Sequence, residues 1–300
     1  MLRTRLWMGA ILIALVAGVL VVDQWLARWY PFLFVLVLGL ALLACYELLH
    51  LLGEEARPAP WLCYLAVAAL VVANWLPRVV SAEALDPWYG ITSVFVAAAL
   101  AAFLVEMAAF QAPPHPPHSP AGGEGRVRGQ AVARISLTVW VVAYLGLLPS
   151  FLAQLRWLPP LAGQVATRRA TAALALAIFV PKCGDVGAYF TGRFLGRHPM
   201  APVLSPKKTW EGAAGGLAAA VLAAVILDRF GPVVAGGLAS AAALGAALGI
   251  AGMLGDLAES LIKRDCRQKD ASQVVPGFGG ILDVVDSVLF AAPVAYWWLA

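Results

Sequence analysis

Acidic and basic side chains meet glycine-rich backbone between Asp256 and Asp286, beside an apolar run. Asp256, Ser260 and Lys263 are spaced by four and three residues, so on a helix they share one face. A proline and three glycines then break the helix and let backbone approach a ligand. Asp283 and Asp286 are three apart and point the same way from the first turn of the next helix. Carboxylates, cations and bare backbone together suit a metal ion bound to a polyphosphate.

The same stretch could instead be a solvated extension of the preceding apolar run. We favour a ligand site, because a solvated face does not need a Pro-Gly-x-Gly-Gly break that leads into two aspartates. Carboxylates at the start of a membrane span must be paired, hydrated or bound to a metal.

A second group of ionisable residues, Lys182 and Asp185, lies inside an apolar run. Tyr189 follows four residues after Asp185, so a helix brings the three side chains together. Ionisable groups in a membrane span are costly and normally face a cavity or each other. The pattern leaves two interpretations open: a pair that lines a cavity, or a pair that only fixes helix packing.

A third polar stretch, SPKKTWEG, begins at Ser205 between two apolar runs. Lys207 and Lys208 have the charge to hold a triphosphate. Thr209 or Ser205 would cap the following helix, with Glu211 in its first turn. For a bare lysine pair the alternative is a topology signal that keeps the loop on the cytoplasmic side.

The elements that must position these groups are membrane spans. Of 300 residues, 62% are hydrophobic and 13% are charged, with a mean hydropathy of +0.82, whereas soluble domains carry about 25% charged residues. The composition therefore predicts an all-α, polytopic transmembrane helical bundle. Nine apolar runs reach the roughly 17–25 residues that cross a bilayer: Leu6–Val22, Pro31–Leu52, Pro60–Leu76, Trp88–Phe110, Ala131–Ala153, Ala170–Gly192, Gly212–Leu227, Pro232–Leu254 and Gly280–Trp298.

The runs divide into two parts, residues 1–130 with four spans and a linker, and residues 131–300 with five spans and the polar loops. The linker is rich in proline and glycine, so we interpret His115 and His118 as linker residues rather than metal ligands. Glu47 and Glu106 are interpreted as packing or interfacial groups. The four cysteines form no CxxC pair and predict neither a disulfide framework nor a zinc site.

The distribution of basic residues predicts the orientation. If the first run is a retained span, 14 of the 21 Lys and Arg residues lie on the side of the N-terminus and 6 on the other. The positive-inside rule then predicts a cytoplasmic N-terminus, an external C-terminus and cytoplasmic polar loops. The net charge of +4 is typical of such topology signals rather than of nucleic-acid binding. We interpret the first run as a span, not a signal peptide, because no small-x-small cleavage site clearly follows it.

At these residues the chain resembles the integral-membrane phosphatidate cytidylyltransferases, the CDP-diacylglycerol synthases. The family pattern runs roughly S-x-x-K-R-x4-K-D-x-[GSA]-x2-[LIF]-P-x-H-G-G-x-x-D-R-x-D. The runs that begin at Asp185 (DVGAYFTGR) and Ser205 (SPKKTWEG) are also similar to family motifs, and the likeness covers roughly the C-terminal 120 residues. Phe278 and Val284 stand where the pattern has His and Arg, and Val275 replaces a longer apolar residue. The matching positions of the longer pattern are Ser260, Lys263, Arg264, Lys269, Asp270, Ser272, Pro276, Gly279, Gly280, Asp283 and Asp286.

The resemblance implies a nucleotidyltransferase of phospholipid biosynthesis in the inner, cytoplasmic membrane, which converts CTP and phosphatidic acid to CDP-diacylglycerol and pyrophosphate. The lipid phosphate is already an anion, so catalysis would depend on alignment and charge neutralisation rather than on a strong base. The resemblance implies a Mg²⁺ centre on Asp256, Asp283 and Asp286, with a second cation as an option. It implies catalytic roles for Asp185, Lys263, Arg264 and Asp286, and substrate contacts for Lys182, Ser205, Lys207, Lys208, Thr209, Lys269, Asp270, Gly279 and Gly280.

Other functions remain open at this point. A polyprenol kinase or an archaeal-type lipid cytidylyltransferase would also use CTP at a membrane, and the product would distinguish them. An ion or solute transporter would use intramembrane Lys182 and Asp185, but transporters usually place their sites between repeated halves, and the sequence contains no repeat. If the protein were purely structural, the concentration of Asp, Lys and Gly residues in its C-terminal part would have no role. The sequence leaves open the acyl-chain preference, a homodimer, the number of metal ions and the effect of Phe278 and Val284.

Overall fold

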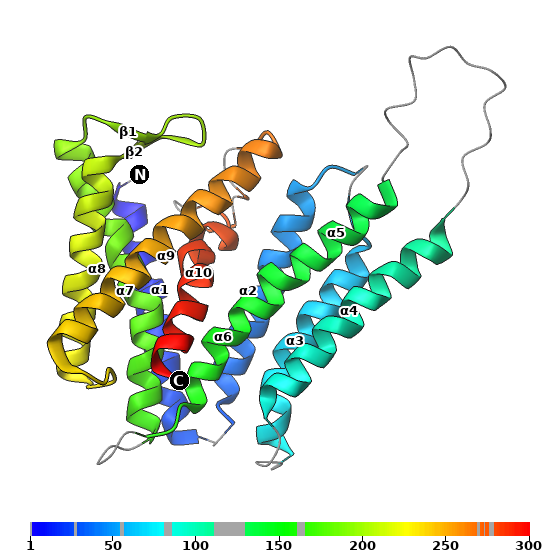
Figure 1. Ribbon diagram of the computed structural model, residues 1–300, viewed down its shortest axis with the longest axis horizontal. Coiled ribbons are helices and arrows are strands. Elements are labelled where there is room, and N and C mark those ends of the chain that lie inside the picture. Colours follow the sequence, from blue (N-terminus) through cyan, green and yellow to red (C-terminus); the bar gives the residue numbers. More distant parts are fainter. Residues whose placement is uncertain are drawn as a thin grey trace.

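The computed structural model is a bundle of long helices with one β-hairpin at one end (Figure 1). It describes residues 2–26, 29–54, 57–80, 86–110, 130–160, 166–268, 271–272, 274–275 and 279–300. The N-terminal end of α1 (Leu2–Leu26) lies at the same end of the bundle as the hairpin, whereas the C-terminus lies at the opposite end (Figure 1). Further along the chain follow α2 (Pro31–Leu51), α3 (Pro60–Val79), α4 (Pro87–Ala109), α5 (Gln130–Val142), the π-helical turn η2 (Ala143–Leu147), α6 (Leu148–Gln154), the 3-10 turn η3 (Leu155–Trp157), α7 (Ala166–Leu195), β1 (Pro199–Ala201), β2 (Ser205–Thr209), α8 (Trp210–Phe230), α9 (Gly237–Asp265) and α10 (Ile281–Leu299).

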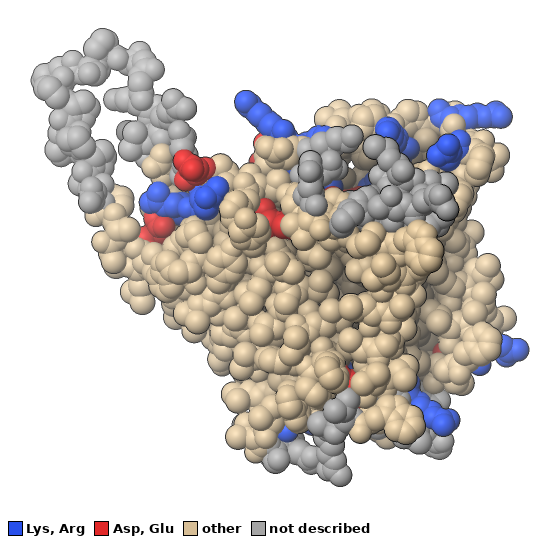
Figure 2. Space-filling model, turned by 180° about the vertical axis from the view of Figure 1, so that it is seen from behind, with Lys and Arg blue, Asp and Glu red and all other residues tan. Residues whose placement is uncertain are grey.

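The prediction of a polytopic helical bundle is confirmed. Eight helical segments of the described part are long and apolar enough to cross a membrane, and each coincides with a predicted run. The remaining predicted run, Leu6–Val22, which is the first in the chain, falls in α1. The described apolar part of α1, Trp7–Asp23, is shorter than the other eight segments. Figure 2 shows a broad band with few charged side chains between two ends where the charged side chains gather.

One boundary differs in a way that matters for chemistry. The eighth run is predicted to end near Leu254, yet α9 continues without a break to Asp265. Asp256, Glu259 and Lys263 therefore stand on the last turns of a spanning helix rather than on a separate element.

Local sequence explains where the helices begin. Pro31, Pro60 and Pro87 occupy the first helical position of α2, α3 and α4, where a missing N–H costs nothing. The carboxylate of Asp23, near the end of α1, accepts hydrogen bonds from the N–H groups of Phe32 (3.0 Å) and Leu33 (2.7 Å). That carboxylate satisfies donors at the start of α2 that have no partner within the helix.

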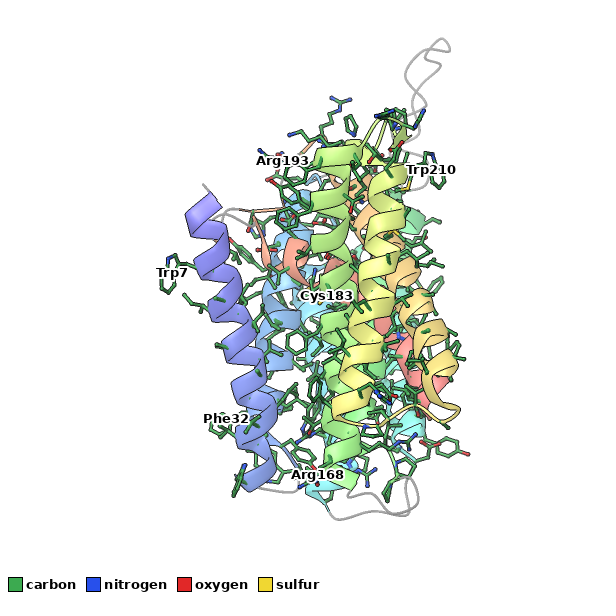
Figure 3. The ribbon with its side chains drawn as sticks, turned by 90° about the vertical axis from the view of Figure 1, so that its left-hand side faces the viewer. Trp7, Phe32, Arg168, Cys183, Arg193 and Trp210 are labelled. Carbon is green, nitrogen blue, oxygen red and sulfur yellow. The ribbon has the colours of Figure 1, made fainter. Side chains whose placement is uncertain are left out.

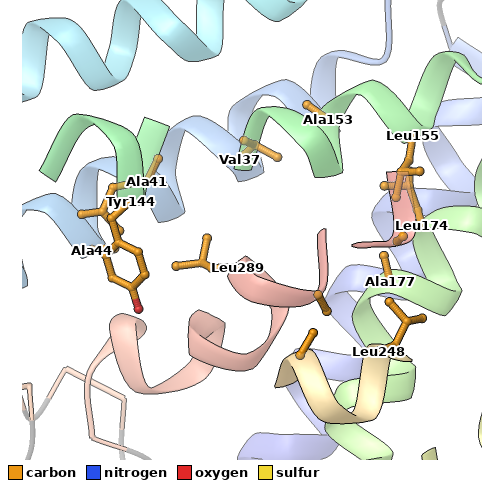
Figure 4. Packing of buried hydrophobic residues seen from close by; sticks show 14 of the residues in the cluster. Val37, Ala41, Ala44, Tyr144, Ala153, Leu155, Leu174, Ala177, Leu248 and Leu289 are labelled. Atoms are coloured by element: carbon orange, nitrogen blue, oxygen red, sulfur yellow. The ribbon is translucent and has the colours of Figure 1, made fainter. Parts of the chain in front are cut away.

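The apolar core draws side chains from most of the spanning helices. Figure 4 shows buried Val37 of α2, Leu174 of α7, Leu248 of α9 and Leu289 of α10 among its members. The cluster includes residues of both predicted parts of the chain, so residues 1–130 and 131–300 share a core. The proposed division between these parts stays a prediction, because most of the linker lies outside the described residues.

Helices α7, α8 and α9 approach closely because small residues face one another. A Cβ added at Gly216 of α8 would lie 2.9 Å from the Cβ of Ala188 on α7. One added at Gly249 of α9 would lie 2.8 Å from the Cβ of Ala220 on α8. Between membrane helices such close packing stabilises the bundle, since lipid is as apolar as the core.

The polar stretch after α7 forms a hairpin rather than the expected open loop. Strands β1 and β2 pair antiparallel, with Ala201 opposite Ser205 and Pro199 opposite Thr209. The Trp210 N–H donates to the His198 carbonyl at 3.0 Å, so the ladder ends where α8 begins. Pairing within this short ribbon gives the backbone of the SPKKT segment a fixed shape.

Candidate active site

Three carboxylates meet at the hairpin end of the bundle. Asp256 and Glu259 come from α9 and Asp286 comes from α10, and one oxygen of each lies within 4.8 Å of the others. The two helices come this close because position 255 is glycine: a Cβ there would overlap the carbonyl oxygen of Asp286. Glu259 and Asp286 are 1% and 5% exposed, so their charges need partners.

Helix α7 adds a second layer to this cluster. Lys182 Nζ lies 3.1 Å from Asp286 Oδ1 and 3.3 Å from Asp185 Oδ2, and Ser287 Oγ donates to Asp185 Oδ2 at 3.0 Å. Figure 3 shows α7 along its length, with Cys183, the neighbour of Lys182, midway and Arg193 near the hairpin end. The Lys182–Asp185 pair therefore forms as the spacing predicts, and it continues into the carboxylate cluster.

Lys263 joins the cluster to the start of α10. Its Nζ lies 2.8 Å from Glu259 Oε2 and 2.5 Å from Asp283 Oδ1. The other oxygen of Asp283 accepts from the N–H groups of Gly280 (2.7 Å) and Ala271 (3.2 Å). Asp283, which lies in the first turn of α10, thus caps the start of that helix.

Two members of the expected ligand set of Asp256, Asp283 and Asp286 lie in this group of three carboxylates, and the ligand set itself stays a prediction. Asp283 lies outside the group of three carboxylates, because it neutralises Lys263 and satisfies backbone donors at the start of α10. Glu259 stands in its place. The sequence pattern could not separate the two, since both lie on faces that point toward the same polar region.

The hairpin brings one of its two lysines to the cluster. Lys208 Nζ lies 2.8 Å from Asp256 Oδ2, whereas the side chain of Lys207 is exposed. Thr209 Oγ1 accepts from the Gly212 N–H at 3.1 Å, which confirms a capping role for Thr209. Ser205 lies in β2, opposite Ala201.

Two further side chains hold this hairpin against the helices. The Glu211 carboxylate accepts from the N–H groups of Arg197 (3.1 Å) and His198 (3.2 Å). Arg264 Nε donates to the Leu204 carbonyl at 3.3 Å, so it contacts the turn of the hairpin rather than the carboxylates.

Glu47, for which the sequence predicts a packing or interfacial role, has defined partners at the site. This α2 residue is 2% exposed and accepts from the N–H groups of Ile281 (2.9 Å) and Leu282 (2.8 Å) and from Ser272 Oγ (2.6 Å). It fixes the N-terminus of α10, the helix that carries Asp286. The available signal was its charge within an apolar run, which requires a partner. Glu106, by contrast, pairs with Arg134 at 2.7 Å.

Several predicted residues add less to the site. Lys269, Asp270 and the segment 276–278, which includes Phe278, lie outside the described residues. Gly279 adopts φ +112°, which only glycine reaches without strain, and Gly280 precedes the first turn of α10. Val284, at the position of the pattern's Arg, packs against the apolar core.

The charges of this network favour a divalent cation. Five carboxylates, of Asp185, Asp256, Glu259, Asp283 and Asp286, are paired with the three ammonium groups of Lys182, Lys208 and Lys263, which leaves two negative charges in excess. The buried Oε1 of Glu259 has no hydrogen-bond partner within the described part of the chain. Carboxylate oxygens are the ligands that hard divalent ions prefer. The residues present therefore fit such an ion.

The chain is similar to a known protein family along nearly its whole length, and to individual bacterial proteins along part of it. The model of the cytidylyltransferase family matches residues 3–300. A phosphatidate cytidylyltransferase of Brucella suis is 45% identical over 112 residues, which cover 37% of this chain and 41% of that protein. One of Haemophilus influenzae is 43% identical over 112 residues, covering 36% and 39%. One of Mycobacterium bovis is 35% identical over 178 residues, covering 59% and 54%. Each alignment thus spans less than two thirds of the relative's length.

Proposed function

The chain belongs to the cytidylyltransferase family, and from this premise we propose that it transfers the cytidylyl group of CTP to phosphatidate. The products would be CDP-diacylglycerol, a precursor in phospholipid synthesis, and pyrophosphate. The observation that carries the proposal is the ion-pair network in which five carboxylates and three lysines meet at one end of a membrane bundle. The names of the aligned relatives support the same reaction.

In this reaction a phosphate oxygen of the lipid attacks the α-phosphorus of CTP, and the bond from that phosphorus to the bridging oxygen of the β-phosphate breaks. The nucleophile carries its own negative charge, so it needs no strong base. The barrier comes from bringing anions together in line, and fixed positive charges lower it.

Each lysine has a role that follows from its position. Lys208, with exposed Lys207 beside it, would release Asp256 and bind triphosphate oxygens as the nucleotide enters beneath the hairpin. Lys182 and Lys263 lie deeper, between buried carboxylates, where they would neutralise charge on the reacting phosphates. Arg264, Ser205 and Thr209 would keep the hairpin in place over the site. Asp185 would orient Lys182. Gly279 and Gly280, which carry no side chain, would let phosphate oxygens approach the start of α10.

The carboxylates of Asp256, Glu259 and Asp286 would hold a divalent cation, and we propose Mg²⁺. Such an ion, when bound, withdraws charge from phosphoryl oxygens and so favours attack at phosphorus. The residual negative charge of the network supports one ion, and a second cation would have to displace a lysine from Asp185 or Asp283.

We also propose a location and an orientation. The site lies at the end of the bundle where α1 begins, and most Lys and Arg residues fall on the same side of the membrane. The protein would then reside in the cytoplasmic membrane with its site open to cytoplasmic CTP, while the two acyl chains of the substrate remain in lipid. A homodimer stays a prediction, which light scattering of the purified protein in detergent would check.

A direct assay tests the reaction. Purified protein should convert phosphatidate and labelled CTP to CDP-diacylglycerol and pyrophosphate when Mg²⁺ is present. Asp256→Asn should remove this conversion, whereas the matched variant Asp265→Asn, at the exposed end of α9, should retain it. Size-exclusion chromatography in detergent would establish that both variants are folded. A phosphorylated lipid and CDP as products, or nucleotide-independent solute flux, would contradict the proposal in favour of a lipid kinase or a transporter.

A further inference from the structure

Tyr144 occupies an irregular turn in the span that runs from α5 to α6. Residues Ala143–Leu147 form a π-helical turn, in which the Leu148 N–H donates to the Ala143 carbonyl five residues back. Pro149 follows directly, and a proline within a helix removes a donor and crowds the preceding turn. Such π-helical turns are rare and recur at functional sites.

Aromatic neighbours fix the ring of Tyr144. It stacks on Trp140 with centroids 5.6 Å apart and planes 10° apart, and it meets Phe290 edge to face at 6.4 Å. The residue is 5% exposed. Figure 4 shows the hydroxyl pointing away from its own helix, toward the first turns of α10.

The hydroxyl at the end of this ring is buried and has no hydrogen-bond partner among the described residues. Leaving a buried donor unpaired is costly. The ring contacts Phe290, which follows Asp286 by one helical turn on α10, so it lies beside the helix that carries this carboxylate. It therefore stands at the edge of the carboxylate cluster, on the side of the apolar core.

We propose that the Tyr144 hydroxyl donates a hydrogen bond to a phosphate oxygen of the lipid substrate, an inference that rests on the proposed function. Lys182 engages Asp286 Oδ1 and Lys263 engages Glu259 Oε2, and the unpartnered Glu259 Oε1 would be taken by the proposed cation. The acceptor for the Tyr144 hydroxyl would then be a group of the incoming substrate. Phosphate oxygens are strong acceptors.

The lipid phosphate fits better than the nucleotide. Tyr144 belongs to a spanning segment and is surrounded by core residues. The lysines proposed to hold CTP lie instead on the hairpin, at the end of the bundle. The Tyr144 hydroxyl would therefore meet the lipid phosphate on the core side of the cluster, away from the hairpin.

Steady-state kinetics of Tyr144→Phe tests the proposal, because this change removes one oxygen and keeps the ring contacts. The KM for phosphatidate should rise on the order of tenfold, the effect of losing a hydrogen bond to a charged group, while the KM for CTP stays unchanged. The matched control is Tyr296→Phe, whose hydroxyl accepts from Trp88 Nε1 at 2.8 Å, away from the carboxylates. It should leave both KM values unchanged.

Unchanged kinetics in Tyr144→Phe would overturn the inference, and so would a rise in the KM for CTP alone. If the wild type makes no CDP-diacylglycerol, the proposed function fails instead, so the two failures are distinguishable. Thermal unfolding gives a second readout that needs no turnover. Phosphatidate added without CTP should raise the unfolding temperature of the wild type more than diacylglycerol does, and this difference should shrink in Tyr144→Phe. Equal stabilisation of the wild type by both lipids would also contradict the proposal.

Discussion

Lys208 Nζ, on the β-hairpin, lies 2.8 Å from Asp256 Oδ2, on α9. The contact joins two polar stretches that the sequence separates by 48 positions. It places a hairpin from the surface over buried carboxylates, with the lysine ready to exchange its carboxylate partner for an incoming phosphate.

Lys208→Met should weaken nucleotide binding. The variant keeps the length and apolar stem of the side chain but loses the charge, and we expect the KM for CTP to rise on the order of tenfold, since a charge-assisted contact to phosphate is worth about 1.5–3 kcal/mol. Kinetics at fixed phosphatidate would measure this effect. Arg197→Gln is the matched control, because it removes an exposed basic side chain at the base of the same hairpin. Equal effects of the two changes would mean that only the overall surface charge matters.

Glu47→Ala should destabilise the bundle and remove activity together. Two backbone donors of α10 and the Ser272 hydroxyl would lose their acceptor, at about 1–3 kcal/mol for each donor left unsatisfied. Thermal unfolding in detergent would report the loss. Glu106→Ala gives the comparison, since its partner Arg134 is partly exposed and regains water, so a smaller effect is expected. A variant as stable as the wild type would show that Glu47 does not hold α10.

Glu259→Gln should raise the Mg²⁺ concentration that gives half-maximal activity. The change keeps the size of the side chain but removes one of three negative charges around the proposed cation. Chelation should stop turnover in the wild type, and a titration with Mg²⁺ should restore it. The comparison with Asp283→Asn is informative, because Asp283 pairs with Lys263 and caps α10. A larger shift in metal requirement for Asp283→Asn would return Asp283 to the ligand set in place of Glu259.

Gly255→Ala should separate α9 from α10. A methyl group at this position would collide with the backbone of Asp286, and overpacking of this kind costs about 1–3 kcal/mol. Activity should fall because Asp286 would move away from Asp256. Gly39→Ala, on α2 with nothing within 4 Å of the added Cβ, should instead be neutral or stabilising, by up to about 1 kcal/mol. Unfolding temperatures and turnover of the two variants, measured side by side, would decide this.

Much of the local structure follows from short-range sequence. The apolar runs predict the spanning helices, the spacing of Lys182 and Asp185 predicts their pairing, and Thr209 is one of the two predicted helix caps, with Ser205. These features depend on residues within about four positions of one another, where helical periodicity and capping rules operate. The hairpin was missed because its strands are short and its pairing is set by contacts with Glu211 and Arg264.

By itself the sequence determined that this chain is a helical membrane protein and which polar stretches could do chemistry, because composition and spacing of near neighbours carry that information. Only the tertiary structure decided which carboxylates stand together. In the structure Glu259, not Asp283, groups with Asp256 and Asp286, and Lys208 pairs with Asp256. Glu47 accepts a hydrogen bond from Ile281, at the start of α10 and 234 positions away in the sequence. Contacts at such separations depend on how whole helices pack against one another, and that packing is set by glycine contacts and buried polar pairs that no local spacing reveals.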